Sequence, residues 1–135
     1  MPADLRHAAL HECGHAHVAA LCGVAGHVQL SVSNAGVHGS FVIPAGQEMS
    51  QAVRERIAVA GAAATALYED PAIDVAQLAR RIERLTSGFS RSDAQLCNGI
   101  LSALALNDTL NWLRAHWPEV EALARREVAR FGVGW

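Results

Sequence analysis

The feature that most constrains this chain is a pair of histidines, His11 and His15, with Glu12 directly after the first of them. In an α-helix of about 3.6 residues per turn, side chains four residues apart lie on the same side, so both imidazoles can bind one metal ion. Glu12 then lies beside the ion, where its carboxylate can accept a proton from a water. This HExxH arrangement is typical of zinc-dependent hydrolases, and it predicts a helix, a metal site and a general base in one segment.

The residues around the motif favour a helix from Ala3 to Val24, with Asp4 near its start and Gly23 near its end. Gly14 lies inside this helix, although glycine costs about 1 kcal/mol relative to alanine in a helix interior. We therefore expect another part of the fold to cross closely over Gly14, near the metal site.

The rest of the chain predicts one small hairpin and several helices. Residues 28–43 alternate apolar and polar side chains around the turn-forming segment 33–36, which favours a β-hairpin. A second helix is expected over residues 50–68, because its apolar positions recur at helical spacing and residues 58–66 are nearly all small. Further helices are expected at 74–85, from 90 or 92 through Leu106, at 109–116 and at 118–131, with a break at 86–90 and Asp108 as a helix cap. The expected fold class is mainly α with one small β-hairpin, in a single domain spanning residues 1–135.

Composition excludes several classes of function. All 11 basic residues are arginines, so a Walker lysine and a Schiff-base lysine are both absent, and the net charge of -2 gives no reason to expect nucleic acid. Cys13, Cys22 and Cys97 form no CxxC pair, which indicates a reducing compartment. No run approaches about 18 apolar residues, and residues 1–7 lack the apolar core of a signal peptide. We expect a cytoplasmic protein without a membrane span.

A zinc site with an open position needs a third protein ligand, and local spacing does not supply one. The first glutamate after His15 is Glu48, and the longer HExxHxxGxxH pattern is absent. The acidic residues between Glu48 and the last expected helix are Glu48, Glu55, Glu69, Asp70, Asp74, Glu83, Asp93 and Asp108. Glu55 and Glu83 are expected on solvent-facing surfaces among arginines. Asp93 allows two interpretations, a metal ligand or the acid of an S-x-x-D capping box that begins at Ser90.

Other polar residues near the motif have simpler interpretations. His7 lies four residues before His11, but an alanine follows it, so we expect His7 near the cleft and outside the ligand set. His17 points away from the expected metal, and Cys13 is expected in the core. His38, on the hairpin, is expected to be exposed or hydrogen-bonded, at a place where it can border the cleft.

Residues 8–20, with the motif at their centre, resemble the HEAGHA-type helix in the peptidase domain of FtsH-type ATP-dependent zinc metalloproteases. The similarity continues in the same order along the chain. Residues 42–44 end a strand, residues 57–64 are rich in alanine and glycine, and Ser92-Asp93 opens an apolar helix where this family has its aspartate ligand. Residues 115–124 are similar to the last helices of small stand-alone relatives.

The resemblance implies a helical zincin-like peptidase domain that binds one Zn²⁺ through His11, His15 and Asp93. It implies that Glu12 acts as general base in peptide-bond hydrolysis, with peptides or unfolded protein segments as substrates. The family's ATPase module and membrane anchors have no counterpart in this sequence, so we expect ATP-independent activity.

The chain departs from the family in carrying Thr65-Ala66 where a pair of glutamates is common. This departure keeps an alternative open, a non-catalytic zinc-binding pseudopeptidase that serves as an interaction or regulatory module. A zinc hydrolase acting on a non-peptide amide is a third interpretation. Substrate preference, oligomeric state and a separate partner protein stay open at this level.

Overall fold

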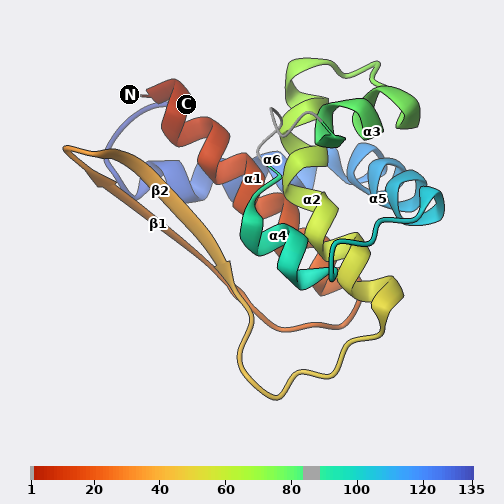
Figure 1. Ribbon diagram of the computed structural model, residues 1–135. Helices are drawn as coiled ribbons and strands as arrows, with labels where there is room; N and C mark the ends of the chain where they lie inside the picture. Colours follow the sequence, from red (N-terminus) through yellow and green to blue (C-terminus); the bar gives the residue numbers. More distant parts are fainter. Residues whose placement is uncertain (1, 84–88) are drawn as a thin grey trace.

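The computed structural model describes residues 2–83 and 89–135 and shows a mainly helical molecule with one two-stranded hairpin (Figure 1). In chain order the elements are α1 (Pro2–Leu21), β1 (His27–Ser33), β2 (Gly36–Val42), α2 (Gln51–Glu69), α3 (Val75–Glu83), α4 (Arg91–Leu96), α5 (Ala103–Ala115) and α6 (Trp117–Ala129). The expected fold class is therefore confirmed. The expected end of the third helix near Leu85 and most of the break at 86–90 lie outside the described residues.

Small side chains bring α1 and α2 into close contact at the centre of the fold (Figure 1). A Cβ atom at Gly14 would lie 2.6 Å from the carbonyl oxygen of Ala60 and 2.7 Å from the Cβ of Ala64. Only a residue without a side chain fits there, which confirms the predicted close crossing over Gly14. The crossing fixes α2 directly against the helix that carries the motif.

The hairpin lies along α1 (Figure 1). Its apolar side chains pack against that helix. β1 and β2 are antiparallel, with Leu30 opposite Gly39, and this register confirms the predicted turn around residues 33–36. Val28, Leu30 and Val32 face a buried cluster formed by α1 and α6. Because the sheet of the described chain has two strands, β2 pairs with β1 along one edge only.

The expectation of one helix from residue 90 through Leu106 is wrong, because the chain breaks there into α4 and α5. Asn98 and Gly99 adopt left-handed backbone conformations, with φ of 57° and 70°, which end α4. Ser102 then caps α5 by accepting a hydrogen bond from a backbone N–H. Asp108, expected to cap a following helix, lies inside α5.

The expectation that Glu55 faces solvent is also wrong. Its side chain is only 6% exposed, and its Oε1 accepts a hydrogen bond from the backbone N–H of Ser102 at 2.6 Å. This hydrogen bond lowers the pKa of the Glu55 carboxyl, because it stabilises the ionised form. Glu55 therefore holds the start of α5 against α2. Its carboxylate is bonded to Ser102 and does not contribute to the motif.

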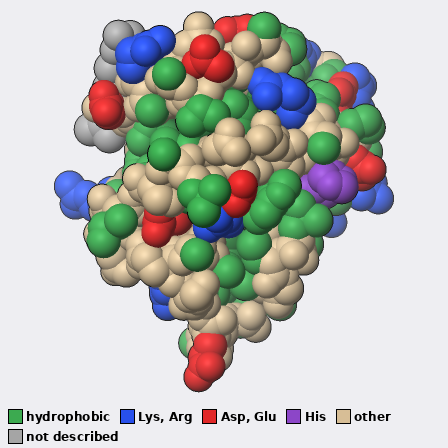
Figure 2. Space-filling view, turned by 90° about the vertical axis from the view of Figure 1, so that its right-hand side faces the viewer, with side chains coloured by type: hydrophobic (Ala, Val, Ile, Leu, Met, Phe, Trp, Pro, Cys, Tyr) green, Lys and Arg blue, Asp and Glu red, His purple; other side chains and the backbone are tan. Residues whose placement is uncertain are grey.

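The surface of the described residues has no field of a single charge sign on the side shown in Figure 2, where acidic, basic and apolar side chains are interspersed. Within residues 2–83 and 89–135, no helix has both the length and the hydropathy to cross a bilayer.

Candidate metal centre

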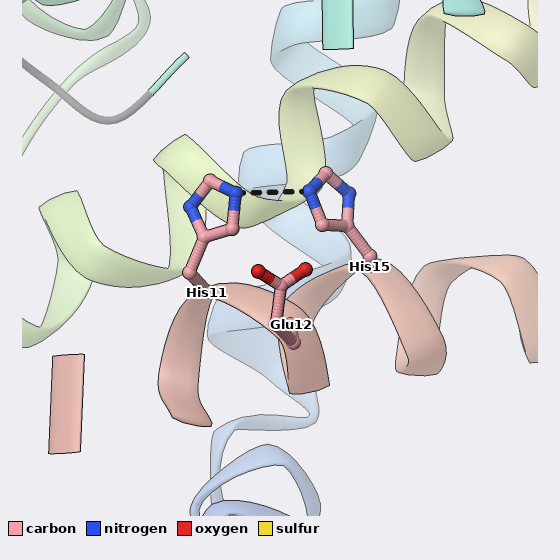
Figure 3. Close-up of side chains that lie close together, drawn as sticks. All are labelled: His11, Glu12 and His15. Atoms are coloured by element: carbon pink, nitrogen blue, oxygen red, sulfur yellow. Dashed lines mark hydrogen bonds between the residues drawn. The ribbon is translucent and has the colours of Figure 1, made fainter. Parts of the chain in front are cut away.

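The two histidines of the motif turn their rings toward the same space between α1 and α2 (Figure 3). The Nε2 atoms of His11 and His15 lie 3.1 Å apart. His15 is 3% exposed, and its Nδ1 donates a hydrogen bond to the carbonyl oxygen of Ile57 at 2.6 Å. With the proton on Nδ1, the neutral ring presents the lone pair of Nε2, which is the form that binds a metal.

Asp93 reaches the same space from α4. Its Oδ1 lies 3.2 Å from the Nε2 of His15, and its Oδ2 lies 3.5 Å from the Nε2 of His11. A tetrahedral zinc ion with bonds of about 2.0–2.2 Å holds its ligand atoms about 3.3–3.6 Å from one another. The three side chains therefore form a triangle, with a different Asp93 oxygen facing each histidine, and its closest distances are near the ligand spacing around one zinc ion.

The capping-box interpretation of Asp93 is confirmed, and the same side chain faces both histidines. Its backbone N–H donates to the hydroxyl of Ser90 at 3.1 Å, and the backbone N–H of Ser90 donates to Oδ2 at 3.1 Å, which completes a capping box. The cap fixes the carboxylate at the start of α4 with its oxygens toward the histidines. The capping box thus orients the residue that the family resemblance assigns as third ligand.

The electrostatics of these three side chains favour a positive charge between them. Burial raises the pKa of Asp93, but hydrogen bonds from His11 and His15 outweigh it and hold that pKa well below its usual range. For His15 burial acts in the opposite direction and lowers the pKa, because the charged form of histidine is the protonated one. The contact with Asp93 outweighs burial and raises the pKa of His15 above its ordinary value. A cation placed among the three donors would supply the charge that they stabilise.

Gly61 of α2 leaves the room that an ion needs. A Cβ atom at this position would lie 2.5 Å from the Nε2 atoms of both His11 and His15. The glycine therefore keeps open the space onto which the two nitrogens converge, which fits a metal ion bound there. From the sequence, Gly61 was predicted only to be one of several small residues in the second helix. It is the single glycine in the run 58–66, and this position is the signal that could have identified it as part of the site.

Replacing Gly61 with alanine should displace both imidazoles and weaken metal binding at least tenfold, because the new methyl group would occupy the space between their nitrogens. Equilibrium dialysis with zinc would measure the loss. Gly134→Ala is the matched control, since no atom lies within 4 Å of a Cβ placed there. Equal zinc affinity in the Gly61 and Gly134 variants would contradict this role.

The Glu12 carboxylate points toward the rings of His11 and His15 (Figure 3), and the hairpin residue Gly39 lies against it. A carboxylate oxygen of Glu12 lies within 4.8 Å of the ligand nitrogens of His11 and His15, and the residue is 8% exposed. Burial raises the pKa of its carboxyl, although both histidines oppose the shift. A Cβ atom at Gly39 would lie 3.1 Å from Oε2, so β2 passes directly over this carboxylate.

A cleft of about 750 Å³ opens beside these residues. It is lined by His7, Ala8, His11, Glu12, His15, His38, Gly39, Ser40, Phe41, Ile43, Thr65, Glu69, Arg81, Ser90, Ser92, Asp93 and Leu96. The ring of Phe41 stacks on that of His15, with centroids 6.2 Å apart. The cleft therefore gives a ligand access to the candidate metal centre along β2 and α4.

The remaining sequence candidates lie where they were expected. His7 lines the cleft, with its Nε2 3.2 Å from Oε1 of Glu69, and His38 is an exposed residue at the cleft border. Cys13 is buried in the core, where burial raises the pKa of its thiol to about 12. His17 faces the opposite side of α1, toward α6.

Among the residues that the structure describes, one group could hold a metal ion, formed by His11, Glu12 and His15. The sequence matches no protein-family model and no curated protein. What the chain does is therefore inferred from the side chains of the cleft, namely three convergent donor atoms, a neighbouring carboxylate and an accessible strand.

Proposed function

We propose that this chain is a zinc-dependent metallopeptidase, related to the FtsH-type peptidase domains that its sequence resembles and independent of ATP. The observation that carries the proposal is the convergence of His11, His15 and Asp93, with the Glu12 carboxylate beside them. The two Nε2 atoms lie 3.1 Å apart, Oδ1 of Asp93 lies 3.2 Å from that of His15, and Oδ2 lies 3.5 Å from that of His11. Two imidazoles and one carboxylate with an open position are a typical donor set of catalytic zinc.

His11, His15 and Asp93 would hold the ion. A zinc ion in this position supplies a Lewis acid that lowers the pKa of a water and polarises a peptide carbonyl. Glu12 accepts the proton of the attacking water and delivers it to the amine nitrogen of the broken peptide bond. The hydrogen bond from His15 to Ile57 keeps the imidazole in the required tautomer during this cycle.

The hairpin suits a substrate in extended conformation. Residues 38–41 of β2 line the cleft, and β2 is hydrogen-bonded to β1 on its other side. A peptide added along the free edge of β2 would form main-chain hydrogen bonds and pass over the metal centre. Gly39 lets this strand approach Glu12, so the peptide would lie close to the proton acceptor.

The rival proposal is a non-catalytic zinc-binding module. Thr65 is the observation in its favour, because it lines the cleft where the related family commonly has a glutamate, and its hydroxyl is bonded to the carbonyl oxygen of Ala62 at 3.1 Å. The buried Glu12 next to the histidines favours the peptidase, since a purely structural metal site has no use for it.

Metal analysis together with a broad peptide library tests the proposal. We expect about one zinc ion per chain at His11, His15 and Asp93, cleavage of library peptides, loss of cleavage with a chelator and recovery on adding zinc. Bound zinc without cleavage of any peptide would reject the peptidase in favour of the non-catalytic module or a hydrolase for a different amide. Failure to bind zinc would reject the metal centre itself.

A further inference from the structure

A second pair of histidines lies on the opposite side of α1 from the metal centre. His17 of α1 faces His116, which ends α5 and begins α6. Their ring centroids are 5.2 Å apart and their planes are tilted by 47°. The two residues are far apart in sequence, so the packing of α1 on α6 brings them together.

Neither imidazole has another evident task. The Nε2 of His17 is buried and has no hydrogen-bond partner among the described residues, which is a costly state for a polar atom. The side chain of His116 occupies the N-cap position of α6 but makes no capping hydrogen bond. Within the described part of the chain, the ring nitrogens of both histidines are therefore free to bind a metal ion.

The separation of the rings matches that of two imidazoles on one metal ion. With metal–nitrogen bonds of about 2.0–2.1 Å and a tetrahedral angle, the ring centres lie about 5 Å apart. The rings of His11 and His15 lie 4.7 Å apart, close to the 5.2 Å between His17 and His116.

A carboxylate is available on the same helix end. Glu119 lies in the first turn of α6, three residues after His116, and its backbone N–H donates to the carbonyl oxygen of His116 at 3.0 Å. Residues at this spacing lie on the same side of a helix. The charge of Glu119 acts on the imidazole of His17, where it favours a cation.

We propose that His17 and His116 form a second binding site for a divalent transition metal such as Zn²⁺. The bound ion ties the end of the motif helix to the junction of α5 and α6, two residues beyond the metal ligand His15. This site is independent of the peptidase proposal, because it shares no ligand with the cleft.

Zinc titration of the full chain, followed by metal analysis, tests the second site. Wild type should bind one zinc ion more than either His17→Ala or His116→Asn, and His27→Ala, an exposed histidine on β1, should bind as many as wild type. His116→Asn keeps a favoured N-cap residue, so it decides the question if His17→Ala fails to fold. The proposal is overturned if a folded His17 or His116 variant binds as many zinc ions as wild type.

The variant His11→Ala separates this result from the metal centre of the cleft. It should lose the cleft ion and keep the ion that depends on His17 and His116. If wild type binds one ion that His116→Asn removes and His11→Ala retains, the second site stands and the cleft metal proposal fails.

Discussion

Replacing Glu12 with glutamine should lower the rate of peptide cleavage by about 10²–10⁴-fold, the usual contribution of a positioned general base. The amide has nearly the shape of the carboxylate but accepts no proton at neutral pH. Because Glu12 lies outside the triangle of His11, His15 and Asp93, the zinc content of the variant should equal that of wild type. Single-turnover cleavage of a library-derived peptide, with metal analysis of the same sample, measures both.

Glu48→Gln is the matched control for this experiment. Glu48 is an exposed glutamate outside the residues that line the cleft, so its replacement changes the charge equally and should leave cleavage unchanged. If Glu12→Gln cleaves peptides at the wild-type rate, another group accepts the proton and the proposed role of Glu12 is wrong. If the variant loses zinc instead, Glu12 is a ligand.

Replacing Asp93 with alanine should weaken zinc binding by more than about 100-fold, and cleavage should be lost with the metal. Residues that only orient metal ligands cost about 10- to 100-fold when they are removed, and a ligand costs more. The physical reason is the loss of both the carboxylate oxygen and the negative charge beside His11 and His15. Competition with a chromogenic chelator measures the zinc dissociation constant.

Ser90→Ala distinguishes a lost ligand from a lost helix cap. It removes the hydroxyl that accepts the Asp93 backbone N–H, at a cost of about 1 kcal/mol in folding free energy, but it retains the Asp93 carboxylate. We expect this variant to be less stable and still to bind zinc. An Asp93→Ala protein with wild-type zinc affinity would place the third ligand elsewhere.

The fold was largely predictable because its signals are local. The hairpin follows from alternation and turn residues, and α1 and α2 follow from helical periodicity and helix-forming composition. The break between α4 and α5 was missed because apolar residues continue across it, whereas Asn98 and Gly99 end α4 through backbone conformation. An apolar pattern alone does not report that change.

Only the part of the candidate site that lies on one helix was predictable from the sequence. His11, Glu12 and His15 follow from spacing on one helix, but Asp93 comes from α4, and spacing alone could not distinguish a ligand from a cap. Gly61 stands out as the single glycine of the run 58–66, but its role at the site depends on where α2 crosses α1. Glu55 was misplaced for the same reason, since its partner Ser102 belongs to a distant helix start.

The close crossing of α1 and α2 has a consequence for the conformational entropy of the metal centre. Where the two helices meet, Gly61 lies against both imidazoles, and Gly14 lies against Ala60 and Ala64, so these contacts involve only backbone and single methyl groups. Such residues have no side-chain torsions, so no rotamer change beneath the rings can fill the space or give way when an ion enters. If the proposed ion binds at this surface, it should order few additional degrees of freedom, so that little binding free energy is lost to ordering.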